Sequence, residues 1–176
     1  MQPMTHSVRR LSAFKDIVGA RRYLEVGVAN GDTFHALEFE TQVAVDVSFR
    51  FDPSEFERPG RSYHEMPSDD YFTNVSRTSD RFDVIFLDGL HTFEQTLRDF
   101  ACALTLIDDD GIILIDDVFP NDVFSALPTP REATERRTQA GLTGGAWHGD
   151  VYKVIFAIND FFPNVDFRTI FGSGNP

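Results

Sequence analysis

The chain has 176 residues, one cysteine and a formal net charge of −12, and 41% of its residues are hydrophobic. This length fits one domain, and the apolar content is sufficient for a complete hydrophobic core. A single cysteine excludes both an internal disulfide framework and a zinc site built from several cysteines. The negative charge repels nucleic-acid backbones and anionic membrane surfaces, so neither a nucleic acid nor a membrane is expected as a partner.

The N-terminal segment predicts a helix. No apolar run in the sequence approaches the ~20 residues of a membrane span. Arg9, Arg10 and Lys15 interrupt residues 1–20, whereas a signal peptide needs an uninterrupted apolar core. We therefore expect an amphipathic first helix within residues 1–20 of a cytoplasmic protein.

Short apolar runs then alternate with helical patterns along the chain. Strands are predicted at residues 22–26, 42–46, 62–66, 82–87, 111–115 and 165–171. Helices are predicted at 32–39, from about residue 67 onward, and at 151–162. Within 82–87 and 111–115 the apolar residues follow one another instead of alternating with polar ones, which is typical of strands covered on both faces of a parallel sheet.

A helix that packs on this sheet is predicted after residue 92. Its apolar residues recur at three- and four-residue spacing, at Phe93, Leu97, Phe100, Ala101, Leu104 and Ile107. Cys102 lies on the same helix, and we interpret it as a core residue.

Residues 118–149 interrupt this alternation with three prolines and four glycines. A short helix at 131–139 is compatible with the pattern. A loop of this length in a compact domain usually has a function, so we expect a lid or an acceptor-binding loop.

The alternation of strands and helices predicts an α/β fold with a doubly wound, Rossmann-like, mostly parallel sheet, in a single domain over residues 1–176. Ligands bind such sheets beyond the carboxyl ends of the strands. Functional residues should therefore follow Val26, Val45, Leu87 and Ile115 directly.

A glycine turn follows the first predicted strand, with Gly27 and Gly31 in G-x-x-x-G spacing. This spacing differs from the G-x-G-x-x-G of dinucleotide enzymes and disfavours a pyrophosphate cofactor. Glycines at this place let the backbone approach a ligand closely, although any turn from strand to helix favours glycine. Asp46 ends the second predicted strand, where it could accept hydrogen bonds from a ribose diol or be a helix cap or a solvated strand end.

Three aspartates, Asp88, Asp116 and Asp117, follow the fourth and fifth predicted strands. If these strands are neighbours, the carboxylates converge and repel one another unless a cation compensates them. Oxygen ligands suit Mg²⁺, Mn²⁺ or Ca²⁺. The alternative is that one aspartate caps a helix and another is solvated. His91 could face the same crevice as a proton acceptor, or be a capping or surface histidine.

Trp147, His148 and Lys153 flank the end of the long loop. They could line an acceptor pocket, and packing roles are equally open.

Several motifs together resemble the class I S-adenosylmethionine-dependent methyltransferases. The closest likeness is to the metal-dependent O-methyltransferases of sugar, macrolide and polysaccharide tailoring. The motifs are LEVGVANGDTF, VAVDVS, MPSDDYF, FDVIFLDGLHTFEQTLRDF, GIILIDDVFP and GDVYK. They occur in the family's order over about residues 20–160, and FLDGLHTFEQTLRDF followed by IDDVFP is the most specific part.

The resemblance implies a role for each matching residue. His91 would be the general base, and a divalent metal, expected to be Mg²⁺, would bind Asp88, Asp116 and Asp117. Asp46 would bind the ribose hydroxyls of S-adenosylmethionine, and Ser68 and Asp69 would lie beside its adenine. The remaining cofactor-binding residues, around its methionine part, would be Glu25, Gly27, Asn30, Gly31 and Thr33.

The implied function is S-adenosylmethionine-dependent O-methylation of a small polar acceptor, such as a sugar or natural product. Three alternatives stay open: a catalytically silent methyltransferase-like binding or scaffold domain, metal-independent transfer, and an NAD-dependent oxidoreductase, against which the glycine spacing argues. The family's fold usually ends in a β-hairpin. Here we expect six strands and no last hairpin strand. The short segment before residue 22 leaves open whether the protein forms a homo-oligomer.

Overall fold

The computed structural model describes residues 5–77 and 80–170. These residues form two compact units. The sheet unit comprises residues 1–89 and 98–115, and the second unit comprises residues 90–97 and 116–176. The expectation of a single domain over the whole chain stays a prediction.

The sheet unit is built on five parallel strands in the order β3-β2-β1-β4-β5. They are β1 (Arg22–Val26), β2 (Thr41–Asp46), β3 (Arg61–Glu65), β4 (Phe82–Leu87) and β5 (Ile107–Ile115). This arrangement confirms the predicted doubly wound α/β fold and makes β1, β4 and β5 consecutive neighbours. The strand order reverses direction between β1 and β4, which is the point where ligands bind in such sheets.

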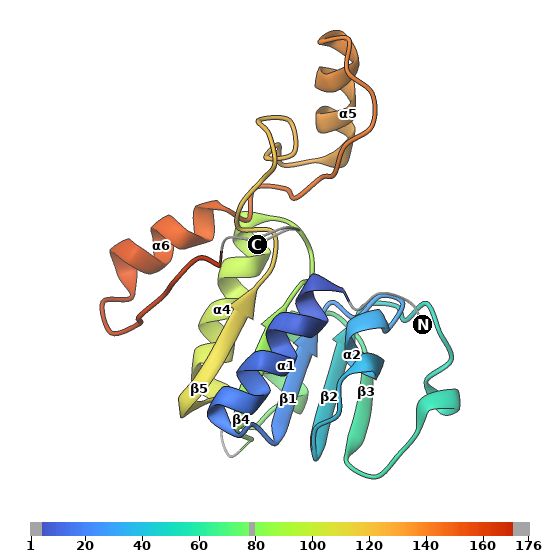
Figure 1. Ribbon diagram of the computed structural model, residues 1–176, viewed down its shortest axis with the longest axis vertical. Helices are drawn as coiled ribbons and strands as arrows, with labels where there is room; N and C mark the ends of the chain where they lie inside the picture. The colour runs from blue at the N-terminus through green and yellow to red at the C-terminus, as the bar shows by residue number, and fades with distance from the viewer. Residues whose placement is uncertain (1–4, 78–79, 171–176) are drawn as a thin grey trace. The chain divides into compact units, whose positions relative to one another are not determined.

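Helices connect the strands. They are α1 (His6–Val18), α2 (Asp32–Ala36), α3 (Ser68–Asp70), α4 (Phe93–Leu106), α5 (Pro130–Gln139) and α6 (Lys153–Phe161), with a short 3₁₀ helix η1 (Pro53–Phe56) and a π turn η2 (Tyr71–Val75). The β1-α2-β2 and β4-α4-β5 crossovers run in opposite directions along the sheet, so right-handed connections place α2 and α4 on opposite faces. Figure 1 shows α1 and α2 in front of the sheet.

The core of the sheet unit lies between α1, α2 and one face of the sheet. It gathers Leu11 of α1, Phe34 of α2, Tyr23 of β1, Ala44 of β2 and Phe86 of β4, each no more than 1% exposed. Neighbouring residues along the same strands, such as Leu24 and Ile85, are also fully buried. Burial on both faces explains why the apolar residues of β4 follow one another in sequence instead of alternating with polar ones.

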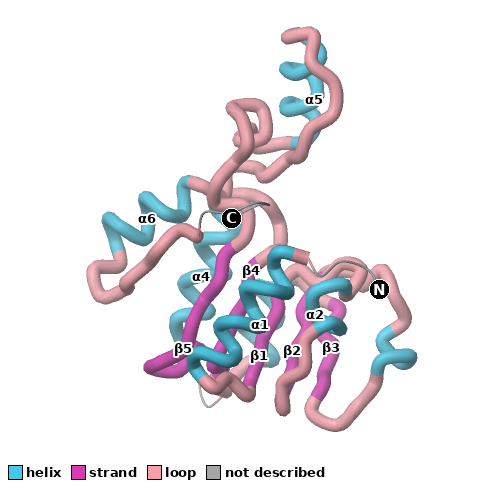
Figure 2. Tube along the Cα trace, viewed as in Figure 1, coloured by secondary structure: helices cyan, strands magenta, loops and turns pink. Residues whose placement is uncertain are grey.

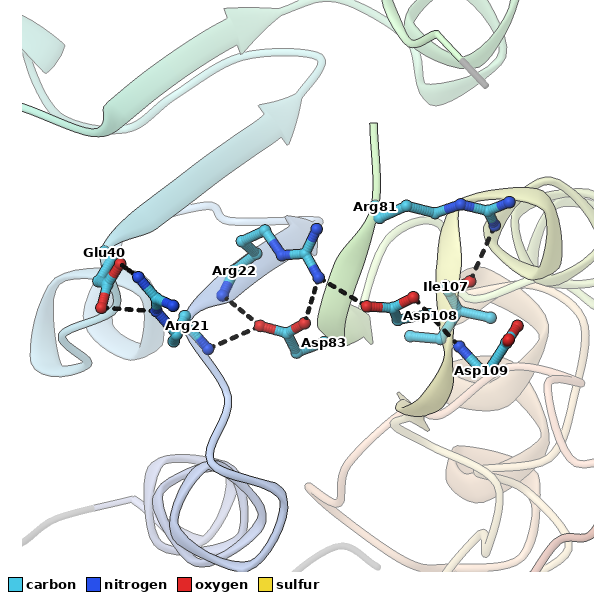
Figure 3. Close-up of polar contacts among 8 residues, drawn as sticks. All are labelled: Arg21, Arg22, Glu40, Arg81, Asp83, Ile107, Asp108 and Asp109. Carbon is cyan, nitrogen blue, oxygen red and sulfur yellow. Dashed lines mark hydrogen bonds and ion pairs between the residues drawn. The ribbon is translucent and has the colours of Figure 1, made fainter. Parts of the chain in front are cut away.

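Ion pairs hold the amino-terminal edge of the sheet (Figure 3). Arg22 of β1 contacts Asp83 of β4 and Asp108 of β5, each at 2.6 Å. Asp83 also accepts the backbone N–H groups of Arg21 and Arg22 at 2.7 and 2.8 Å. One arginine therefore bridges three adjacent strands.

The fifth strand is longer than its apolar run predicted. It begins at Ile107, which pairs with Phe82, whereas Ile112 pairs with Val84, so the acidic residues between them form an irregular bulge. Charged residues are tolerated there because β5 is an edge strand of the described sheet. Ile107 consequently does not belong to the helical stripe, and α4 ends at Leu106.

Three predicted helices also need correction. The α2 helix stops at Ala36, three residues before the expected end, because Leu37 is in an extended conformation. The α6 helix begins at Lys153 and ends at Phe161. In α4 the buried residues include Phe100, Ala103 and Leu106, while Ala101 is exposed and Cys102 only half-buried. The buried face of α4 is thus rotated from the predicted one.

The expected strand at 165–171 is wrong over the residues that the structure describes. Residues 165–170 are irregular, and Phe171 lies outside the described residues (Figure 2). The segment starts with a turn in which Val165 N–H donates to Phe162 O at 3.0 Å. A strand needs a neighbour for its hydrogen bonds, and alternating side chains alone do not supply one. Five strands are therefore described, where six were expected.

Across the described residues, none of the helices combines the length and the apolar character needed to cross a bilayer.

Candidate functional site

The glycine turn after β1 packs tightly against the end of β4 in the sheet unit. Gly27 has φ = +88°, a left-handed conformation that favours glycine. A Cβ atom on Gly27 would lie 1.9 Å from the carbonyl oxygen of Asp88. Gly31 (φ = +78°) begins α2 as its N-cap, and Thr33 lies in the first turn of this helix. The glycines are thus required by the backbone itself, and the exposed Asn30 lies between them.

Asp46 holds the same turn from the end of β2. Its Oδ2 atom accepts the backbone N–H groups of Val28 and Ala29 at 2.7 and 2.8 Å. Its Oδ1 atom accepts the N–H of Ser48 at 2.9 Å. A carboxylate offers about four acceptor positions, so Asp46 keeps capacity for a further donor. Asp46 therefore has a structural role that the sequence did not reveal, because it holds the glycine turn. Its predicted role as a ligand for a ribose diol stays a prediction.

Glu25 lies beneath the turn and is 2% exposed. It accepts a hydrogen bond from the hydroxyl of Tyr23 at 2.6 Å. Burial raises the pKa of the Glu25 carboxyl well above its usual range, and the nearby carboxylates Asp88 and Asp46 raise it further, although the Tyr23 hydrogen bond lowers it. The carboxyl group, near the end of β1, should therefore keep its proton to a higher pH than an exposed glutamate does.

The remaining predicted residues of the sheet unit follow β3 and β4. Ser68 and Asp69 begin α3 directly after Pro67. Asp69 forms an ion pair with Arg98 of α4 at 3.3 Å. Asp88 is the first residue after β4, and its N–H donates to Val26 O at 2.8 Å, which extends the pairing of β1 with β4.

His91 and Asp117 form the centre of the second unit. The Oδ2 atom of Asp117 lies 2.7 Å from Nδ1 of His91, at ion-pair distance, although the pair does not have the geometry of a hydrogen bond. Asp117 is 6% exposed and has φ = +62°, which is uncommon for a residue with a side chain. Asp116 supports this conformation, because its Oδ1 accepts the N–H of Asp117 at 3.0 Å.

Four consecutive residues, Trp147 to Asp150, enclose His91; we call them the 147–150 segment. The indole of Trp147 stacks on the His91 ring at 5.3 Å with 14° between the planes. A Cβ atom on Gly149 would lie 1.7 Å from His91 O, so only glycine fits. Asp150 accepts the N–H of Phe93 at 2.8 Å and pairs with Lys153 at 2.7 Å. His91 is therefore held from several sides.

His148 lies near the other carboxylate oxygen of Asp117, the one that His91 does not contact. Its Nε2 atom lies 3.8 Å from Oδ1 of Asp117, and the side chain is 4% exposed. Among the described residues, the buried Nδ1 atom of His148 has no hydrogen-bond partner. An unsatisfied buried polar group costs about 1–3 kcal/mol. The sequence marked His148 only as a possible pocket residue, and its contact with Asp117 is visible only in three dimensions.

Residues 118–149 are ordered by their own contacts. Asp122 accepts the N–H of Ser125 at 2.7 Å and pairs with Arg137 of α5 at 2.8 Å. These contacts, led by the backbone bond from Ser125, lower the pKa of Asp122 to about 2. The guanidinium of Arg137 also donates to Ala146 O at 2.9 Å. The expected short helix is confirmed as α5, which begins after the N-cap Thr129.

The structure thus groups the predicted residues within each unit. Glu25, Gly27, Gly31 and Asp46 gather around one turn at the carboxyl edge of the sheet. His91, Asp116 and Asp117 gather in the second unit, with Trp147 and His148 as additional members. Asp88 belongs to the sheet unit and lies three residues before His91 along the chain.

Comparison with known proteins agrees with this fold. A family model described as a methyltransferase domain matches residues 24–118, which are 95 of the 176 residues. The chain therefore belongs to this methyltransferase family, and its fold is that of the class I S-adenosylmethionine-dependent methyltransferases. The match includes the glycine turn, Asp46, Asp88, His91 and Asp117, whereas the 147–150 segment lies outside it.

A similar solved structure is the O-methyltransferase TomG from Streptomyces achromogenes, involved in tomaymycin synthesis and crystallised in complex with SAM. The two structures superpose with a TM-score of 0.52 at 18% sequence identity, over 77% of this chain and 68% of TomG. This likeness supports the fold. No curated protein matches the sequence.

Proposed function

We propose that the protein transfers a methyl group from S-adenosylmethionine to a hydroxyl group of a small polar acceptor. The observation that carries the proposal is the His91–Asp117 contact at 2.7 Å, in a chain that belongs to a methyltransferase family. An alcohol is a poor nucleophile until a base takes its proton, and a histidine next to a carboxylate suits that task.

The sheet unit has the donor chemistry for the cofactor. S-adenosylmethionine combines an ammonium group, a ribose diol and an adenine, and when bound it supplies an electrophilic methyl group on a sulfonium. Asp46 brings a carboxylate to the end of β2 for the diol, and the buried carboxyl of Glu25 in β1 would lie beside the methionine part of the cofactor. Ser68 and Asp69 at the start of α3 would contact the adenine. Gly27, Asn30, Gly31 and Thr33 would contact the methionine part through the turn.

The carboxylates fit a divalent cation. Asp117 is a buried carboxylate between two imidazoles, and Asp116 precedes it in an adjoining turn. Buried acidic groups in such a place are stabilised by a positive ion, and oxygen donors suit Mg²⁺ or Mn²⁺. We propose that Asp88, Asp116 and Asp117 hold the ion, which would lower the pKa of a bound acceptor hydroxyl.

His91 would accept the proton as the acceptor oxygen bonds to the methyl carbon. If Nδ1 of the neutral imidazole donates its hydrogen to Asp117, the lone pair is on Nε2, the atom that would receive the proton. Hydrogen bonds in catalytic sites often tighten only when substrate is bound, which would align this bond. Trp147 and Gly149 restrict the ring and backbone of His91, which favours one orientation of the base.

The acceptor would bind near residues 118–149. Phe119, Val123 and Leu142 in this segment are 49%, 75% and 50% exposed, so apolar surface is available for an acceptor. A sugar or natural product that presents two adjacent hydroxyl groups could bind the ion through both oxygens. Exclusion of water by this segment would protect the reaction.

Calorimetric titration with S-adenosylhomocysteine, with and without Mg²⁺, tests the proposal first. We expect saturable cofactor binding, and a Mg²⁺ site that is lost in Asp116→Asn. His91→Ala should lower turnover by roughly 10²–10⁴-fold, the usual contribution of a general base, and leave the affinity for S-adenosylhomocysteine nearly unchanged. Turnover would be measured on acceptors found in a screen of sugars and phenols.

Two results would contradict parts of the proposal. Absence of cofactor binding by the folded protein would refute the proposed methyltransferase activity and favour a binding or scaffold domain. Its candidate contact surface would be β5, which has β4 as its only strand partner among the described residues. Turnover that persists in a chelator would instead show metal-independent transfer, with the aspartates in structural roles.

A further inference from the structure

The sheet unit has a cavity away from the predicted cofactor-binding residues. A cavity of about 650 Å³ opens between η1 and the start of β3 and is lined by residues 53, 57–59 and 61–63. Arg61 is the first residue of β3 and pairs with Gln42 near the start of β2. The cavity is therefore at the amino-terminal edge of the sheet, while the glycine turn and Asp46 are at the carboxyl edge.

Two arginines of this cavity share one neutral acceptor. The Nη2 atoms of Arg58 and Arg61 both donate to Oε1 of Gln42, the Arg61 bond at 3.2 Å. Gln42 is 1% exposed and is itself fixed by a hydrogen bond from its Nε2 to Phe34 O at 3.0 Å. Two guanidinium groups are thus held close together by a rigid side chain that carries no charge.

Carboxylates compensate these charges poorly, in a chain whose net charge is −12. Within the described part of the chain, Arg61 has no carboxylate at ion-pair distance, and Arg58 contacts only Glu38 at 3.4 Å, whose side chain is 81% exposed. An exposed pair of this kind contributes about 0–1 kcal/mol. Glu57 also lines the cavity, but neither arginine pairs with it at ion-pair distance in the described residues. Like charges in close proximity repel, so the pair of arginines favours binding of an anion.

An aromatic ring and a backbone carbonyl fix the guanidinium of Arg61 in place. The guanidinium of Arg61 lies over the Phe34 ring, 5.3 Å from its centroid, and donates to Phe56 O at 3.3 Å. His35 stacks on Phe56 at 3.9 Å and contacts the Tyr63 hydroxyl at 3.2 Å. Burial, with the charges of Arg61 and Arg58, lowers the pKa of His35 to about 4. Positive charge at neutral pH is therefore concentrated on the two guanidinium groups, of which Arg61 is preorganised by these contacts.

We propose that this cavity binds the phosphate group of a small molecule, with Arg58 and Arg61 as its ligands. Guanidinium groups match the geometry of phosphate oxygens and form charge-assisted hydrogen bonds with them. Tyr63 and Ser62 add hydroxyl groups to the lining. A second cavity of about 460 Å³ shares Arg58 and Pro59 with the first, which leaves room for the remainder of a phosphate monoester.

Calorimetric titration at constant ionic strength tests this site, with inorganic phosphate and glycerol 3-phosphate as probes and acetate as the carboxylate control. Phosphate probes should bind saturably, and acetate should not compete. Arg61→Gln and Arg58→Gln should each weaken phosphate binding at least tenfold. The matched control is Arg131→Gln, because Arg131 is an 87% exposed arginine paired with Glu135 in α5. It should leave phosphate binding unchanged.

Comparing the affinities for inorganic phosphate and glycerol 3-phosphate shows whether the site prefers the free ion or a phosphate monoester. Tighter binding of glycerol 3-phosphate supports a phosphate monoester, and equal binding supports the free ion. If Arg61→Gln does not fold, Arg61→Lys tests the same point, since lysine keeps the charge and loses the planar fork. Equal phosphate affinity in the arginine variants and the control, or the absence of saturable binding, would overturn the proposal.

The outcome is independent of the methyltransferase proposal. Titration with S-adenosylhomocysteine reports on the carboxyl edge of the sheet, and it should be unchanged in Arg61→Gln. Loss of cofactor binding with phosphate binding retained would count only against the proposed function.

Discussion

Glu25 should make the stability of the protein depend on pH in a predictable direction. The carboxyl is 2% exposed, and burial raises its pKa well above the usual value of 4.5. In the unfolded chain Glu25 ionises near its ordinary pKa, whereas in the folded protein it ionises only at a higher pH. The unfolded state therefore loses a proton that the native state retains, and stability falls as the pH rises between the two pKa values.

Replacement by glutamine removes this penalty. Glu25→Gln keeps an oxygen that can accept the hydrogen bond from Tyr23. Its stability relative to the native protein should therefore increase by about 1.4 kcal/mol per pH unit above pH 5, until the folded pKa is reached. Any cost of placing the new amide N–H groups is the same at every pH and shifts the curve without changing its slope.

Urea unfolding of both proteins at intervals from pH 5 to 7.5 would measure this slope. The matched control is Glu40→Gln. Glu40 is exposed, and its hydrogen bond with Arg21 lowers its pKa. A lowered pKa contributes stability that is complete above the unfolded pKa, so this variant should show a flat difference over the same range. A flat difference for Glu25→Gln as well would refute the argument, because it would mean that Glu25 is ionised in the folded protein.

Two further predictions concern backbone and loop geometry. Gly27→Ala should destabilise the sheet unit by about 3 kcal/mol or more, because its Cβ would lie 1.9 Å from Asp88 O at φ = +88°. Gly19→Ala is the control, since Gly19 also has a positive φ but no atom within 4 Å, and should cost only about 1–2 kcal/mol of strain in thermal unfolding. Equal losses would show that the close approach to Asp88 is unimportant. Arg137→Met should destabilise residues 118–149 locally by about 1–3 kcal/mol, because it removes hydrogen bonds to Asp122 and Ala146. Hydrogen exchange should then rise in this segment and not in β1 or β4; uniform exchange would contradict the local role.

The strands of the sheet unit were predictable because their sequence pattern and their environment agree. β1 and β4 have the predicted boundaries, and their residues 23–26 and 84–87 are buried on both faces of the sheet. The helix α5 was predictable from its proline and N-cap threonine, which satisfy local backbone requirements. Local rules suffice for such elements because the interactions that stabilise their ends lie within a few residues.

Local patterns did not decide the edges of the sheet. Residues 108–110 are acidic, yet they lie within β5, because Ile107 before them and Ile112 after them pair with β4 and Arg22 pairs with Asp108. Residues 165–170 alternate like a strand but have no strand partner among the described residues, so they remain irregular. Strand formation depends on a neighbour, which a sequence pattern does not specify.

The candidate site divides in the same way. The sequence alone placed Gly27, Asp46, Asp88 and Asp117 at the carboxyl ends of strands, because parallel strands direct those ends to one edge. Only the tertiary structure showed that Asp46 holds the glycine turn and that the 147–150 segment encloses His91, more than 50 residues away in sequence. Contacts between residues so far apart arise from chain folding and packing, whereas helix and strand patterns record only the neighbours along the chain.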